Sequence, residues 1–229
     1  MQPVSGGRPA RLPLLPFARL PRAASFDRIR LNMLSKWLLT SKESCAVIGF
    51  TSRARGEGVS TVVAGLARSF GKADPGGVLV LDASGSKRGV ARLLRAKAVP
   101  VALPEREADM PDMRGWITRA AGYGVDVLAL ASAGSLRVGS ASFVQAVLEG
   151  LRPAYHTILV DAGALPESWA ACWLACSNYR VLVIDSSTAT REVLEHERHE
   201  LEGSGISLDG SILNKRTYPI PRLLYWLAR

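Results

Sequence analysis

Residues 45–67 of the chain read CAVIGFTSRARGEGVSTVVAGLA, and this stretch is the most informative feature of the sequence. An apolar run at 45–50 leads into a glycine-rich turn, and a helical pattern begins at Ser60 and Thr61. This is the order of a phosphate-binding loop, which directs backbone N–H groups and a helix N-terminus at phosphate oxygens. The sequence therefore predicts a nucleotide-binding segment that consists of Gly56, Glu57, Gly58, Val59, Ser60 and Thr61.

One position of this loop departs from the pattern. A lysine normally stands between the last glycine and the serine, where it reaches the β- and γ-phosphates. Here that residue is Val59, whose branched apolar side chain carries no charge. We therefore expect a chain that keeps the shape of a nucleotide site and lacks one of its main catalytic charges.

Short apolar runs alternate with helical patterns along the rest of the chain. The expected strands span residues 46–50, 78–81, 125–130, 157–160, 180–184 and 210–213. The expected helices span residues 25–39, 61–70, 113–121, 143–151, 167–176 and 192–202. Continuous apolar strands separated by helices are typical of a mostly parallel sheet that helices cover on both faces. The predicted fold class is α/β, like that of P-loop NTPases, with ligands bound beyond the C-terminal ends of the strands.

The positive charge of the chain is concentrated near its N-terminus. The 229 residues carry a formal net charge of +9, of which the first 40 residues contribute +6 from seven basic residues and one acid. Residues 1–23 contain five prolines, four arginines and no acid, a composition that predicts a flexible basic arm. Such an arm suits an anionic partner, namely a lipid surface, an acidic protein or nucleic acid, although it equally suits a solvated tail. The α/β domain is expected at 24–217, with its N-terminal helix at 25–39.

Hydropathy and cysteine content favour a cytoplasmic protein. No run of about 18 uncharged apolar residues predicts a transmembrane helix, and the first residues lack the pattern of a signal peptide. The three cysteines, Cys45, Cys172 and Cys176, lie in apolar surroundings and form no CxxC pair. An odd number of such cysteines indicates a reducing compartment and argues against a zinc site.

Two expected strands end in an aspartate. The strand at 78–81 runs into Asp82, and the strand at 157–160 runs into Asp161. Behind a phosphate-binding loop, acids at the ends of neighbouring strands can hold Mg²⁺ directly or through water. Together with Ser60, Asp82 and Asp161 form the predicted metal site. The two aspartates are also the candidate catalytic residues. Asp185 follows a third strand, and we interpret it as a turn residue.

The C-terminal residues 218–229 predict a short amphipathic helix. Its apolar residues are Leu223, Leu224, Trp226 and Leu227, and arginines flank them. This pattern is typical of a helix that lies in a membrane interface, where the basic arm would supply the second signal that peripheral binding requires. The alternative is that the helix packs on the protein's own surface or on a partner.

Six segments resemble the cytoplasmic domain of bacterial tyrosine autokinases, the BY-kinases. That family belongs to the deviant Walker ATPases, which include the MinD-like division-site and ParA-like chromosome-partitioning proteins. The matching segments are 25–33 (SFDRIRLNM), 51–61 (TSRARGEGVST), 79–88 (LVLDASGSKR), 124–133 (GVDVLALASA), 155–165 (YHTILVDAGAL) and 210–215 (GSILNK). The acidic residue between two glycines of the loop is a feature of this family more than of phosphate-binding loops in general.

The resemblance implies a role for several residues and also shows where the chain departs from the family. It implies that Ser60, Asp82 and Asp161 serve Mg²⁺ and water, and that Asn214 contacts the adenine. The departures lie at Val59, at Ser84 and Ser86 of the second acidic motif, and at 162–164, where the family has TPP. Of the ring-forming pattern ExxRxxR only Arg30 is kept, and the tyrosine-rich tail is reduced to Tyr218 and Tyr225.

We therefore expect a pseudokinase-like regulatory or scaffold subunit of an exopolysaccharide or capsule synthesis and export complex. Its cofactor would be ATP or ADP with Mg²⁺, bound weakly or not at all. Its partner would be an inner-membrane polysaccharide co-polymerase that governs chain length, or another subunit of that complex, met at the cytoplasmic face of the inner membrane. The sequence is also compatible with a homodimer, and DNA is not the expected partner.

Two other functions are consistent with the sequence. The first is an active tyrosine autokinase or ATPase in which Arg53, Arg55, Lys87 or Arg88 replaces the missing lysine. The second is a partitioning-type ATPase that binds DNA or a membrane.

Overall fold

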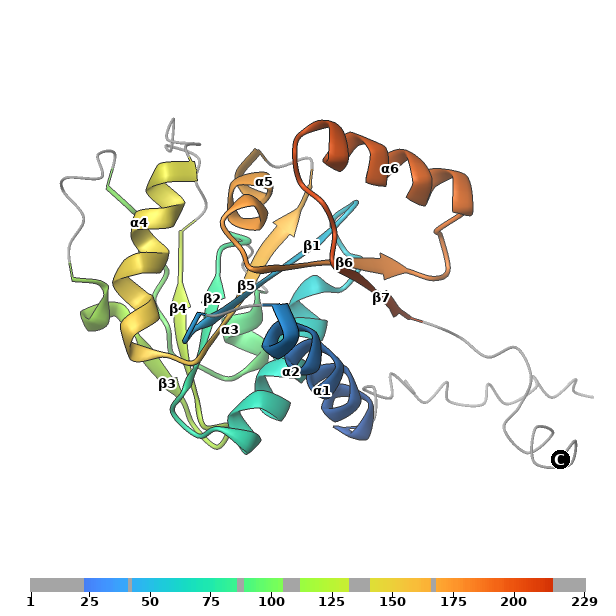
Figure 1. The fold of residues 1–229 in the computed structure, drawn as a ribbon. Coiled ribbons are helices and arrows are strands. Elements are labelled where there is room, and N and C mark those ends of the chain that lie inside the picture. Colours follow the sequence, from blue (N-terminus) through green and yellow to red (C-terminus); the bar gives the residue numbers. More distant parts are fainter. Residues whose placement is uncertain are drawn as a thin grey trace, which may run out of the picture.

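The computed structural model describes residues 23–40, 43–85, 89–104, 112–131, 141–165 and 168–215 (Figure 1). Its strands are β1 (Ala46–Ser52), β2 (Val78–Asp82), β3 (Thr118–Ala120), β4 (Val125–Ala129), β5 (Thr157–Ala164), β6 (Tyr179–Asp185) and β7 (Gly210–Asn214). They form one sheet in the order β3-β4-β2-β5-β1-β6-β7. Neighbouring strands are parallel except for β3, which pairs with β4 in the antiparallel direction. The structure thus has the predicted fold class.

Helices cover both faces of the sheet. The α-helices are α1 (Ala23–Thr40), α2 (Val59–Ala73), α3 (Val90–Leu93), α4 (Ala141–Leu151), α5 (Ser168–Ala175) and α6 (Arg191–Gly203), and the 3₁₀ helices are η2 (Met113–Trp116) and η3 (Arg152–Ala154). Helices α1, α2 and α3 pack on one face, and α4 and α5 pack on the other. Helix α6 joins the second side through Leu201, which packs with Leu174 of α5.

The central strands are apolar on both faces because both faces are covered. Every residue of β1 and β2 is buried. Along β1 the side chains alternate: Ile48 and Phe50 join the cluster under α2, whereas Val47 joins the cluster under α4 and α5. This arrangement explains why these strands read as continuous apolar runs.

One expected element is wrong. Residues 113–121 are not a helix: they form η2 and then β3, whose Thr118 pairs with Val127 of β4. The chain reverses between the two strands through Gly122 and Gly124, which have φ values of 83° and 68°. A left-handed backbone ends any helix at this point, and the antiparallel partner that it brings back provides the hydrogen bonds for a strand.

Other predictions lie wholly or largely outside the described residues. These are the basic arm at 1–23, apart from the start of α1, and the C-terminal helix at 218–229 with Leu223, Leu224, Trp226 and Leu227. Lys87, Arg88, Ser86 and the two late tyrosines are also outside. Among the helices that the structure describes, none has the length and apolar character needed to cross a membrane.

Candidate phosphate-binding site

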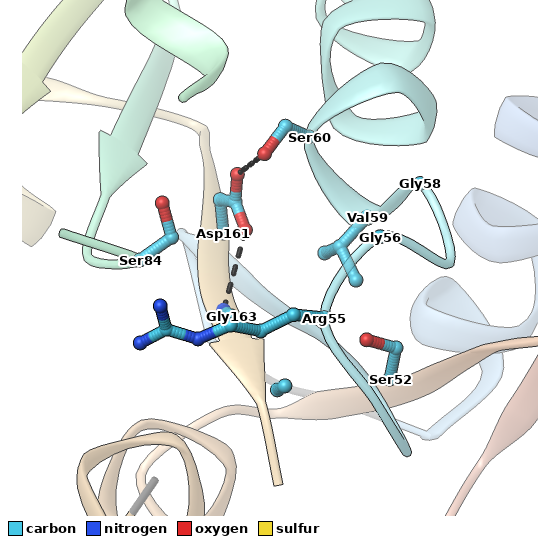
Figure 2. A pocket seen from close by; sticks show the side chains of 10 residues that line it. Ser52, Arg55, Gly56, Gly58, Val59, Ser60, Ser84, Asp161 and Gly163 are labelled. Atoms are coloured by element: carbon cyan, nitrogen blue, oxygen red, sulfur yellow. Dashed lines mark hydrogen bonds between the residues drawn. The ribbon is translucent and has the colours of Figure 1, made fainter. Parts of the chain in front are cut away.

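The glycine-rich segment lies at the C-terminal edge of the sheet, between β1 and α2. It borders a cavity of about 240 Å³ (Figure 2). The lining residues are Ser52, Arg55, Gly56, Gly58, Val59, Ser60, Ser84, Asp161, Gly163 and Ala164. The sheet order explains this set, because β5 is the neighbour of both β1 and β2 and therefore brings its end to the same place.

The loop has the backbone conformation of an anion-binding turn. Gly56 and Gly58 have φ values of 89° and 99°, whereas Glu57 between them does not have a positive φ. Gly58 is the N-cap of α2, and its carbonyl accepts the first helical hydrogen bond from the Val62 N–H at 3.0 Å. The first amides of a helix have no partner within it, so the start of α2 presents N–H donors to the cavity.

At the position of the missing lysine, Val59 is a buried apolar residue. Only 6% of its surface is exposed, and it belongs to the hydrophobic cluster between α2 and the sheet. It also lines the cavity. Val59 therefore contributes packing to the site and supplies no charge for a phosphate.

Ser60 and Asp161 are in direct contact. The Ser60 hydroxyl donates to Oδ2 of Asp161 at 2.6 Å, and the Gly163 N–H donates to Oδ1 at 3.3 Å (Figure 2). Asp161 is fully buried. A hydroxyl and a carboxylate are the oxygen ligands that Mg²⁺ accepts, so these two residues fit such an ion. Thr61, the next residue of the loop, is half-buried and is not among the lining residues.

Asp82 lies beside Asp161 in the sheet but has other contacts. The two residues are register partners of β2 and β5. The carboxylate of Asp82 accepts from the Ser84 hydroxyl at 2.8 Å and from the Ala91 N–H at 3.3 Å, at the start of α3. Burial raises the pKa of Asp82, and these hydrogen bonds oppose the shift. Ser84, rather than Asp82, is among the lining residues.

The basic residues of the loop separate into two roles. Arg53 forms an ion pair with Glu57 at 3.3 Å, and its backbone N–H donates to the same carboxylate at 3.1 Å. Glu57 is buried, so its side chain braces the loop internally. Arg55 lines the cavity, and Figure 2 shows its side chain extending past Gly163 on the side where Ser84 lies. Of the cations considered as substitutes for the lysine, Arg55 is the one that the described structure puts at the cavity.

The end of β7 contacts the loop through Asn214, which the resemblance implies is an adenine contact, and through Lys215, which was not singled out from the sequence. The Asn214 amide Nδ2 donates to the Glu57 carbonyl at 2.8 Å. Lys215 Nζ donates to the Gly56 carbonyl at 2.7 Å and to the Asp185 carboxylate at 2.7 Å. Asp185 also accepts from the N–H and hydroxyl of Ser187, as expected of a turn residue. Lys215 and Ser187 lower the pKa of Asp185 to about 2. No local signal marks Lys215 as part of the loop, because the two segments are far apart in the sequence.

Comparisons with solved structures match this architecture. The kinase domain of VpsO superposes with a TM-score of 0.67 and 22% identity, covering 86% of this chain and 97% of that one. The kinase domain of the Escherichia coli tyrosine kinase ETK gives 0.68 and 20% identity, with 86% and 78% covered. The septum site-determining protein MinD of Pyrococcus horikoshii, solved with Mg-ADP, gives 0.60 and 21% identity, with 79% and 75% covered.

These likenesses establish the fold. The chain has the P-loop architecture of bacterial tyrosine kinase domains, MinD and a ParA-family ATPase. No protein-family model matches the sequence, and no curated protein matches it significantly.

Proposed function

We propose that this chain is a pseudokinase-like regulatory or scaffold subunit of a bacterial exopolysaccharide synthesis or export complex, with a weakened nucleotide site and little or no turnover. The observation that carries this proposal is Val59, a buried apolar residue where the loop needs a lysine, in an otherwise intact loop. The kinase-domain folds of VpsO and ETK and the matching sequence segments support the kinase-like part.

The electrostatics of the cavity support the loss of turnover. Phosphoryl transfer depends on positioning and on stabilising the charge that is spread over the transferred phosphate. Removing one preorganised donor typically costs about 10²–10³ in rate. In this chain Val59 occupies the position of the lysine. Ser84 occupies the position of the second acid after β2, and neither side chain carries a charge. We therefore expect a turnover far below that of an active kinase.

Binding is less affected than turnover. The loop amides and the start of α2 are backbone groups that a change of side chain does not remove. Ser60 and Asp161 would hold Mg²⁺, which would neutralise phosphate charge when bound. A bound nucleotide would then serve to set the conformation of the subunit, as expected of a protein that acts by docking.

The proposed partner is a membrane protein of the same complex, a polysaccharide co-polymerase that governs chain length, met at the inner face of the inner membrane. The basic arm and the C-terminal helix predicted from the sequence would assist this contact. This part rests on the resemblance of the sequence to the autokinases.

A second candidate function has one observation in its favour. Arg55 lines the cavity and carries a guanidinium that can bind phosphate. If Arg55 replaces the lysine, the chain is an active ATPase or tyrosine autokinase. Such an enzyme would lose its ATP turnover in Arg55→Ala and would phosphorylate Tyr218 or Tyr225.

Calorimetric titration with Mg·ATP and Mg·ADP tests the proposal, with the wild type beside Val59→Lys. A charge-assisted hydrogen bond contributes about 1.5–3 kcal/mol, so we expect Val59→Lys to bind about ten- to a hundredfold more tightly. Wild-type protein should bind weakly and release no phosphate above background. Micromolar binding with turnover that Arg55→Ala abolishes would contradict the proposal and establish the enzyme instead.

A further inference from the structure

Two residues at the end of β7 bind two consecutive carbonyls of the phosphate-binding loop. Lys215 Nζ donates to the Gly56 carbonyl, and Asn214 Nδ2 donates to the Glu57 carbonyl, at 2.7 and 2.8 Å. Both donors come from the same side of the loop, because they are neighbours in the chain. The carbonyls of two successive peptide groups are therefore held on the β7 side.

This arrangement determines where the amides point. In a trans peptide the C=O and the N–H of one plane point in opposite directions. The peptide that ends in the Gly56 carbonyl carries the Glu57 N–H, and the next peptide carries the Gly58 N–H. Both amides are consequently directed away from β7. Gly56 and Gly58 line the cavity, and their positive φ values flank a residue without one, which is the alternation found in anion-binding nests.

The packing around this contact is close and includes an uncommon backbone conformation. A Cβ at Gly58 would collide with the Asn214 amide, so the glycine permits the approach. Lys215 has a φ of 53°, one of two positive values among the non-glycine residues that the structure describes. A lysine in this region is strained, and such strain persists where the surroundings hold the residue in place. The carboxylate of Asp185 provides that hold at 2.7 Å.

We propose that Asn214 and Lys215 are positioning residues that turn the Glu57 and Gly58 amides toward the cavity, where they bind the phosphates of a nucleoside diphosphate or of pyrophosphate. The inference rests on the nucleotide binding proposed above. It gives Asn214 a different role from the adenine contact that the resemblance implies. It also explains how a loop without its lysine keeps a site for phosphate, since the donors are backbone groups held by β7.

Two ligands, one without a base and one with a base, distinguish a residue that positions the loop from a residue that contacts the adenine. Wild type, Asn214→Ala and Lys215→Gly are titrated with Mg·pyrophosphate and with Mg·ADP by calorimetry. Glycine at 215 removes the ammonium and tolerates the positive φ, so a loss of binding reports the missing amine. We expect each variant to lose about tenfold in affinity, by the same factor for both ligands. A loss for Mg·ADP with unchanged pyrophosphate binding would show a base contact and overturn the proposal.

Two further variants serve as controls. Ser211→Ala changes an exposed residue of β7 and should bind both ligands like the wild type. Lys215→Arg keeps a cation and should retain most of the affinity. Unchanged affinity in Lys215→Gly would overturn the role of the lysine.

The backbone of the loop gives a readout that needs no ligand. The order parameters of the Glu57 and Gly58 amides, measured by ¹⁵N relaxation, should fall from about 0.85 to below about 0.6 in Asn214→Ala and Lys215→Gly. Ser211→Ala should leave them unchanged. If wild type binds neither ligand, the proposed nucleotide binding fails, and so does the phosphate role of the two amides. Unchanged order parameters would show, independently of any binding, that β7 does not position the loop.

Discussion

At the scale of single residues, the two loop glycines have similar φ values and different surroundings. Gly56 and Gly58 both have φ near 90°. A Cβ at Gly56 would meet nothing within 4 Å, whereas one at Gly58 would collide with the Asn214 amide. The pair therefore separates the cost of a left-handed alanine from the cost of breaking the contact with β7.

We predict that Gly58→Ala destabilises the protein more than Gly56→Ala does. A left-handed alanine costs about 1–2 kcal/mol, and at Gly58 the added Cβ must also displace the end of the Asn214 side chain, whose hydrogen bond to the loop is worth about 0.5–1.5 kcal/mol. Urea denaturation of the two variants and the wild type measures both costs. In the Gly58→Ala background, Asn214→Ala should cost little further stability, because the contact that it removes is already broken. Equal free energies of unfolding in the two single variants would show that Asn214 is not held against the loop.

At the scale of elements, the ends of β6 and β7 are joined to the loop through one ion pair. Asp185 and Asn214 are register partners, and Lys215 links the Asp185 carboxylate to the Gly56 carbonyl. The Lys215 side chain is 47% exposed, whereas that of Asp185 is 9% exposed. The strand ends and the loop therefore form one hydrogen-bonded unit at the edge of the sheet.

The pKa of Asp185 predicts how this unit responds to acid. Because its pKa in the folded protein is about 2, below the ordinary value of 3.8, the carboxylate stabilises the fold above that ordinary value. The contribution is lost as the pH falls from about 4 to about 2. The free energy of unfolding, measured in urea from about pH 5 downward, should fall more steeply for the wild type than for Asp185→Asn. Lys215→Met should flatten the wild-type curve in the same way, and parallel curves would contradict the ion pair.

At the scale of the whole molecule, α1 is tied to the core of the sheet domain. The ring of Phe26 packs where a Cβ on Gly65 of α2 would lie. Ser69 of α2 donates to Asp27 at 2.5 Å and accepts from Arg30 at 3.1 Å. Arg30, the residue kept from the ring-forming pattern of the autokinases, thus binds within its own chain.

We predict that Gly65→Ala loosens α1 and lowers the stability of the whole domain. The added methyl group would displace the buried Phe26 ring, at a cost of about 1–3 kcal/mol. Gly150→Ala in α4 is the matched control, because a Cβ there meets nothing within 4 Å and alanine favours a helix by about 0.5–1 kcal/mol. The midpoint temperature of thermal unfolding should therefore fall in Gly65→Ala and rise in Gly150→Ala. Limited proteolysis should cut α1 sooner in Gly65→Ala than in the wild type. A Gly65→Ala variant as stable as the wild type would contradict this packing.

Much of the fold could be predicted because its signals are local. Buried parallel strands appear as apolar runs, and the glycines between β1 and α2 identify the loop. The prediction failed at 113–121 because a strand of three residues has no periodicity of its own. Residues Thr118–Ala120 form β3 only because the turn at Gly122 and Gly124 brings them to β4.

The α/β class, the loop, its missing lysine and the strand-ending acids could all be predicted from the sequence, because each depends on residue types at short spacing. Which of these side chains contact one another depends on the three-dimensional fold. Asp161 contacts Ser60 while Asp82 turns to α3, and Arg55 lines the cavity while Arg53 pairs with Glu57. The contact of Lys215 with Gly56 spans 159 residues. Such contacts follow from the order of the strands and from side-chain conformations in the packed state, and no local pattern encodes either one.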